Sequence, residues 1–234
     1  MTPDAAAVEN LAISFVVGDC GFFRLAKKLL PRSTRAAQGW IRYAMQNAVK
    51  SFVLELVGLP AYRHLAGRVS GEEEEAMMMN LSELPCSAKL KTLRWNLSGV
   101  RLQLPASATF TSLVDLSLER IELAAGSAPL LSRLVSSACC PRLQKLKLTK
   151  LKLGTLNEIE VLIEAGALLE LSCNEIKGDR WNDLSLELRT PSLRVLRMVH
   201  CYAQALRISA PRLEELVLED LPDEIHVDGI MADC

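Results

Sequence analysis

The chain has 234 residues, of which 50% are hydrophobic, and its formal net charge is −1. The near-neutral charge argues against a nucleic acid or an anionic membrane as a partner that is held by bulk charge. No apolar run approaches the roughly 20 residues that a membrane-spanning helix needs, and the first residues show no secretory signal, so an intracellular protein is expected, in the cytoplasm, the nucleus or both.

The first predicted element is a strand over residues 11–17, where apolar residues alternate with other side chains. Residues 18–34 mix apolar and basic side chains, and Pro31 is expected to end any short helix there. We interpret this stretch as an insertion on the edge of the fold, with a basic amphipathic helix that touches a membrane as the alternative. Residues 35–47 predict a helix. One face of it carries Trp40, Ile41, Ala44 and Ala48.

A strand over residues 49–56 is expected to follow this helix. The chain then reaches a run of four glutamates, Glu72 to Glu75, with no hydrophobic periodicity around it. This composition predicts an acidic loop over residues 66–80. The three methionines at 77–79 are interpreted as the return to regular structure rather than as a metal or cofactor site.

A leucine pattern recurs along the chain. Residues 143–153 spell L-x-x-L-x-L-x-x-L-x-L, which is the signature of a leucine-rich repeat. Residues two apart in a strand point to the same side, so Leu146 and Leu148 are expected to point inward together. One such unit cannot bury its apolar edge alone and needs copies stacked on both sides. Six further segments match in whole or in part, and they start at Val49, Leu90, Leu113, Leu168, Leu193 and Leu213.

Each repeat strand needs a segment that returns the chain along the opposite side. Helices are expected over residues 127–138 and 156–165. Alternation instead predicts short strands over residues 100–104, 184–188 and 206–208, each of which ends near a proline. The inward side chains of the two helices would be Leu130, Leu131, Leu134 and Val135 in the first, and Leu156, Ile159, Leu162 and Ile163 in the second.

These elements predict one domain over residues 1–234, with residues 222–234 as a C-terminal tail. The fold class is α/β, a right-handed leucine-rich-repeat horseshoe with parallel strands on its concave face. Short strands and a few helices would form the convex side.

The outward strand positions of the repeats form three rows across the concave face, because neighbouring strands stand about 4.8 Å apart. The central row is Val53, Arg94, Ser117, Lys147, Ser172, Arg197 and Val217. One flanking row is Ser51, Thr92, Asp115, Lys145, Glu170, Val195 and Glu215. The other flanking row is Glu55, Asn96, Glu119, Thr149, Asn174, Val199 and Glu219. The centre is therefore basic and the flanks are mostly acidic.

Two interpretations of these rows remain open. The charges neutralise one another on an exposed sheet, or Arg94, Lys147 and Arg197 form the floor for an acidic or phosphorylated segment of a protein partner. In the second case the candidate partner-binding set is completed by Lys145, Glu119, Glu170, Glu215 and Glu219.

The sequence shows no pattern that predicts an enzyme, a cofactor or a metal site. The phosphate-binding glycine motifs are missing. His200 and Cys201 are neighbours, and adjacent strand residues point to opposite sides, so a thiol–imidazole pair is not expected. Cys139 and Cys140 precede a proline and predict a turn, with a vicinal disulfide or a zinc site as alternatives that need partners. Seven scattered cysteines without a C-x-x-C pair are typical of a reduced intracellular protein.

Several segments carry a family resemblance. The prolines and leucines of residues 140–148, 190–196 and 208–216 resemble the leucine-rich region of plant F-box/LRR proteins, which often also carry a C-terminal FBD domain. Residues 40–44 followed by 49–54 look like the opening of that region. The resemblance implies that the repeats recognise a substrate protein of a cullin ubiquitin ligase, while an F-box segment docks on the Skp adaptor.

The chain departs from this family in one respect. No F-box-like segment is found before the first strand and no FBD-like domain after Asp220. We therefore expect a recognition array that does not itself bind the Skp adaptor. A truncated or degenerate repeat protein without a ligase role is one alternative, and an enzyme is the other.

Overall fold

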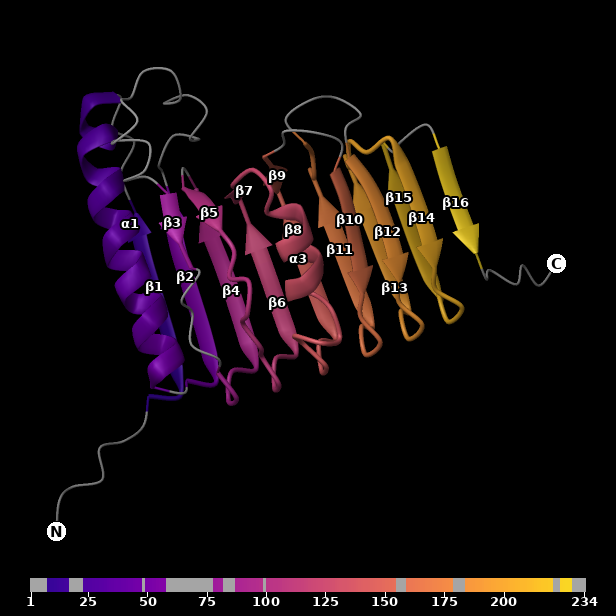
Figure 1. Cartoon of the computed structure of the whole chain (residues 1–234), viewed down its shortest axis with the longest axis horizontal. Coiled ribbons are helices and arrows are strands. Elements are labelled where there is room, and N and C mark those ends of the chain that lie inside the picture. The colour runs from indigo at the N-terminus through magenta and orange to yellow at the C-terminus, as the bar shows by residue number, and fades with distance from the viewer. Residues whose placement is uncertain are drawn as a thin grey trace, which may run out of the picture.

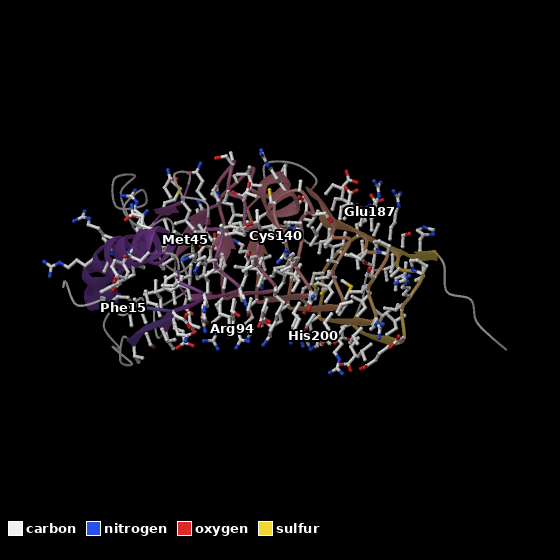
Figure 2. All side chains as sticks on the ribbon, turned by 90° about the horizontal axis from the view of Figure 1, so that it is seen from below. Phe15, Met45, Arg94, Cys140, Glu187 and His200 are labelled. Atoms are coloured by element: carbon white, nitrogen blue, oxygen red, sulfur yellow. The ribbon has the colours of Figure 1, made fainter. Side chains whose placement is uncertain are left out.

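The computed structural model describes residues 8–16, 23–47, 49–57, 78–81, 87–98, 100–154, 159–178, 184–220 and 224–228, and the structural statements below refer to these residues. They form a mostly-β protein with three all-parallel sheets of short strands and two helices (Figure 1). The eight-stranded sheet forms one layer of an elongated stack, and the two four-stranded sheets and the helices form the other (Figures 1 and 2).

The strands of the eight-stranded sheet follow one another in the order of the chain. They are β1 (Asn10–Val16), β2 (Ser51–Val57), β4 (Thr92–Leu97), β6 (Asp115–Glu119), β8 (Lys145–Thr149), β11 (Glu170–Asn174), β13 (Val195–Val199) and β15 (Glu215–Glu219). Leu146 of β8 pairs with Leu116 and with Leu171 on its two neighbours, so the apolar residues stack in rows inside the protein. The register predicted from the leucine pattern and the strand predicted over 11–17 are both confirmed for the described residues.

The second layer contains two sheets of short strands. One holds β3 (Met78–Asn80), β5 (Arg101–Gln103), β7 (Glu122–Leu123) and β9 (Lys152–Leu153). The other holds β10 (Ile159–Glu164), β12 (Leu184–Arg189), β14 (Ala205–Ser209) and β16 (Glu224–Asp228). The short strands predicted from alternation are confirmed as β5, β12 and β14.

Three sequence-based predictions are wrong in this layer. Of the helix predicted over 156–165, residues 159–164 instead form β10, because Val161 and Ile163 alternate with outward side chains and the strand pairs with β12 over its whole length. Residues 156–158 lie outside the described residues. The predicted C-terminal tail contains β16, which pairs with β14 through its own alternating residues. The predicted acidic loop extends too far, because Met78 to Asn80 form β3; its residues 66–77 lie outside the described residues.

Helix α1 (Phe23–Gln46) is longer than predicted, and Pro31 lies inside it. The expectation that Pro31 ends a short helix is therefore wrong, whereas the insertion over residues 18–34 stays a prediction, and its residues 18–22 lie outside the described residues. An internal proline costs a helix about 3 kcal/mol, and the burial of the face carrying Ala37, Ile41 and Ala44 offsets this cost. Trp40 was expected on that face but is 42% exposed, while Ala48 lies outside the described residues.

Helix α3 (Ala128–Leu134) confirms the helix predicted over 127–138, although it is shorter. Leu131, Leu134 and the following Val135 are buried as expected, and Leu130 is half-buried. The expected mixture of short strands and helices in this layer therefore holds, with less helix than the sequence indicates.

A left-handed corner follows each of the last five strands of the eight-stranded sheet. The residues at these corners have φ between 48° and 54° and are Arg120, Lys150, Glu175, His200 and Asp220. A left-handed backbone costs a residue other than glycine about 1–2 kcal/mol. The first four corners each donate their backbone N–H to the carbonyl oxygen of the last residue of the next strand, at 2.7–3.0 Å, which offsets part of this cost.

Candidate protein-binding surface

We call the outer face of the eight-stranded sheet the strand face, and it carries the three predicted rows. Central-row residues lie opposite one another from Val53 to Arg94, Ser117, Lys147, Ser172, Arg197 and Val217. Figure 2 shows Arg94 on the outer side of this layer and Glu187 on the outer side of the other. All eight candidate partner-binding residues therefore share one surface.

Most of the cations on the strand face have a carboxylate partner on a neighbouring strand. Arg94 lies 2.7 Å from Asp115, and Arg197 lies 2.6 Å from Glu215. In the flanking row, the ammonium of Lys145 lies 2.8 Å from Glu170. These pairs are solvent-exposed, and such pairs contribute about 0–1 kcal/mol each. Arg94 and Arg197 are therefore neutralised in the free protein, by pairs weak enough for a ligand to replace.

Lys147 differs from the other two cations of the central row. It is exposed, and the neighbours across its strand are Ser117 and Ser172 rather than carboxylates. Within the described part of the chain, no carboxylate lies within ion-pair distance of its ammonium. Its charge is consequently available to a partner.

A depression of about 380 Å³ lies on the strand face over β2, β4, β6 and β8. It brings together Arg94, Lys147 and Glu119 of the candidate set, whereas the other five lie outside it. Its full lining is Val53, Glu55, Arg94, Trp95, Asn96, Asp115, Ser117, Glu119 and Lys147. Sequence reasoning placed Glu55, Asn96 and Asp115 in the flanking rows but not in the candidate set.

Asn96 adds a second unpaired polar group to this depression. Its side-chain oxygen is buried and accepts no hydrogen bond. A buried acceptor without a donor costs about 1–3 kcal/mol, and because this oxygen has almost no exposed surface, a ligand in the depression does not reach it. The exposed ammonium of Lys147 is therefore the group of this depression that suits the carboxylate or phosphate of an extended peptide.

The thiols and the histidine next to this sheet do not form a reactive pair. Cys139, Cys140, Cys173 and Cys201 are free and buried, so the first two form no vicinal disulfide. Burial raises the pKa of Cys201 to about 11, and a raised pKa keeps a thiol protonated and unreactive. His200 lies on the outer side of the layer, where its Nδ1 is 2.7 Å from Asp220 (Figure 2).

A metal centre and a membrane span have no counterpart among the described residues. Among the described residues, no group of three or more histidine, cysteine, aspartate and glutamate side chains is arranged to hold a metal ion. None of the described helices has both the length and the apolar character to span a membrane. No protein-family model matches the chain, and no curated protein or solved structure matches it either.

Proposed function

We propose that this protein is a leucine-rich-repeat solenoid that recognises a partner protein by binding an extended acidic or phosphorylated segment on the strand face. The observation that carries this proposal is the depression in which the ammonium of Lys147 has no carboxylate partner among the described residues. Within the described residues, Lys147 gains a charged partner only when a ligand is bound.

The dimensions of the depression suit a short extended segment. It covers four adjacent strands, a width of about 14 Å at about 4.8 Å per strand. An extended peptide crosses this width in about four residues. Arg94 and Lys147 stand two strands apart, about 10 Å, so they would meet side chains about three residues apart in the ligand.

The biological context that we propose is substrate recognition in ubiquitination, and it rests on the resemblance to plant F-box/LRR proteins. The repeat strands and the prolines before them are the features that carry this resemblance. The chain is expected to bind a substrate without binding the Skp adaptor itself. A degenerate repeat protein with no partner remains the alternative.

Affinity capture with charge variants tests the binding surface. Partners are captured with the wild-type protein and with the triple variant Arg94→Ala, Lys147→Ala, Arg197→Ala, after circular dichroism has shown that the variant is folded. The matched control removes three exposed arginines from the second layer through Arg133→Ala, Arg189→Ala and Arg207→Ala. The strand-face variant should lose the partner and the control should keep it. Retention of the partner by the folded strand-face variant would disprove the proposal.

Single variants separate the free cation from the paired ones. Lys147→Ala should weaken peptide binding about 10- to 100-fold, because a hydrogen bond to a charged group contributes about 1.5–3 kcal/mol. Lys145→Ala should have a smaller effect, because Lys145 already pairs with Glu170. Equal losses for the two variants would place the binding site outside the depression.

Size-exclusion chromatography with a purified Skp adaptor tests the ligase context. The two proteins are expected to elute separately. Stoichiometric co-elution would instead assign this chain the complete role of its family.

A further inference from the structure

The large exposed hydrophobic side chains of the described residues lie at the two ends of the stack. We define the N-terminal end as β1 with α1, and the C-terminal end as β15 with β16 (Figure 1). Trp40 and Tyr43 of α1 are 42% and 40% exposed, and Leu216 of β15 and Ile225 of β16 are 37% and 39% exposed. Val8 and Val16, which flank or belong to β1, complete this group. None of the six belongs to a strand in the middle of the stack.

The inward-facing residues at both ends are also incompletely covered. Leu11, Ile13 and Phe15 of β1 are only partly buried, as are Leu218 of β15 and Val227 of β16. Equivalent positions in the middle of the sheet are almost fully buried. In a stack of repeats, each unit is covered by its neighbours, and within the described residues these end positions lack the neighbour that every inner strand has.

The two ends present matching edges. β1 and β15 are the two edge strands of one parallel sheet. An edge strand carries a row of backbone N–H and C=O groups that can pair with another strand. If a second copy is shifted along the stack axis, its β1 comes to lie beside β15 in the parallel sense that the whole sheet already has. In the same shift, its α1 approaches β16 in the second layer (Figure 1).

The charges of the two ends are opposite. Helix α1 contains six basic residues and no acidic one, and they are Arg24, Lys27, Lys28, Arg32, Arg35 and Arg42. The described residues 213–220 and 224–228 contain six acidic residues and no lysine or arginine, and the acids are Glu214, Glu215, Glu219, Asp220, Glu224 and Asp228. Glu214, Glu215 and Asp220 pair with Arg194, Arg197 and His200 on the neighbouring strand segment. Arg32, Arg35 and Glu219 are exposed, and within the described residues none of the three has an ion-pair partner.

We propose that two copies of this chain associate head to tail, with the C-terminal end of one docked on the N-terminal end of the next. Apolar side chains meet at the centre of this contact, and the acidic and basic groups meet around them. An interface between two different surfaces leaves one free surface at each end of the pair, so it produces open chains of molecules, or rings where the rotation closes, rather than only dimers. Pairing of identical ends is disfavoured, because it brings like charges together.

Sedimentation velocity of the wild-type protein gives the first test. At about 20 mM salt, the average mass should rise as the protein concentration rises from about 1 to 100 µM. At about 500 mM salt, the mass at a given concentration should fall, because salt screens the charges at the ends. A monomer at every concentration in low salt would overturn the proposal.

Variants at each end give the decisive test, because a head-to-tail contact has two different surfaces. The N-terminal variant is Arg35→Glu with Trp40→Ala, and the C-terminal variant is Glu219→Lys with Ile225→Lys. Each variant should be monomeric by itself under conditions in which the wild-type protein associates. A mixture of the two retains one intact surface of each kind and should form a one-to-one complex and nothing larger.

The controls make each outcome interpretable. Circular dichroism verifies the fold of each variant, and Trp40→Ala alone replaces an N-terminal variant that does not fold. Arg133→Glu with Arg189→Glu changes exposed charges in the second layer away from the ends and should associate like the wild-type protein. If either end variant still associates by itself, or if the mixed variants fail to pair, the contact is not head to tail.

Discussion

Replacing Leu146 by alanine tests the stacking of the repeats. Leu146 is 2% exposed and lies in register between Leu116 and Leu171. The neighbouring strands are held on both sides by backbone hydrogen bonds, so the space left by the side chain cannot collapse. Loss of a buried leucine costs about 2–5 kcal/mol, and the rigid surroundings favour the upper part of this range, about 3–5 kcal/mol. Urea unfolding followed by circular dichroism measures this change in the free energy of unfolding.

The matched control is the equivalent residue at the edge of the same row. Leu216 pairs with Leu196 on one side and is 37% exposed on the other. Water can fill the space left by Leu216→Ala, so the free energy of unfolding should fall by only about 1 kcal/mol. Burial of a whole leucine side chain contributes about 1.5–3 kcal/mol. The comparison is made at low protein concentration, where copies do not associate. Equal losses for the two variants would refute the register of the stack.

Three further predictions concern single side chains, and urea unfolding measures all of them. Thr190→Val should stabilise the protein by about 1 kcal/mol, because the hydroxyl of Thr190 is buried without a hydrogen-bond partner. Its control, Ser132→Ala, should destabilise the protein by about 1 kcal/mol, because the hydroxyl oxygen of Ser132 accepts a hydrogen bond from a backbone N–H. Gly154→Ala should destabilise the protein by about 1–3 kcal/mol, since the new Cβ would lie 2.7 Å from a backbone carbonyl oxygen. Gly39→Ala in α1 should stabilise the protein by about 0.5–1 kcal/mol, since its new Cβ meets no atom within 4 Å. Burial raises the pKa of Cys140 from its usual 9.0 to about 12. The contribution of this thiol to folding stability is therefore complete below pH 9 and is lost as the pH rises through 12. The free energy of unfolding of Cys140→Ala should fall less than that of the wild-type protein between pH 9 and 12.

The strand register could be predicted from the sequence because a leucine pattern with a period of two residues leaves one choice of inward face. The same reasoning failed for residues 159–164, where Ile159, Leu162 and Ile163 fit a helix and Val161 and Ile163 fit a strand. Pairing with β12 decides between them, and a single sequence does not contain that pairing. The prediction that a helix ends at Pro31 failed for a similar reason. The packing of the later turns of α1 outweighs the low helix propensity of proline.

The candidate site was predictable as a set of rows but not as a set of contacts. Row membership of Arg94 and Lys147 follows from the register. Their difference in pairing does not, because Arg94 reaches diagonally to Asp115 in the flanking row, and this contact depends on side-chain conformation. The unpaired oxygen of Asn96 is likewise a property of its packed surroundings. Neither follows from the spacing of the repeats.

The left-handed corners divide the chain into units of unequal length. The corner residues recur at intervals of 30, 25, 25 and 20 residues, yet the strands before them remain in register. The second layer absorbs the difference, with α3 and β7 in the longest unit and β14 in the shortest. Equivalent side chains on the strand face are therefore spaced about 4.8 Å apart from one unit to the next, whatever the number of residues in the unit. Insertions, deletions or a reporter peptide between α3 and β8 can therefore alter the second layer while the spacing of side chains on the strand face stays constant.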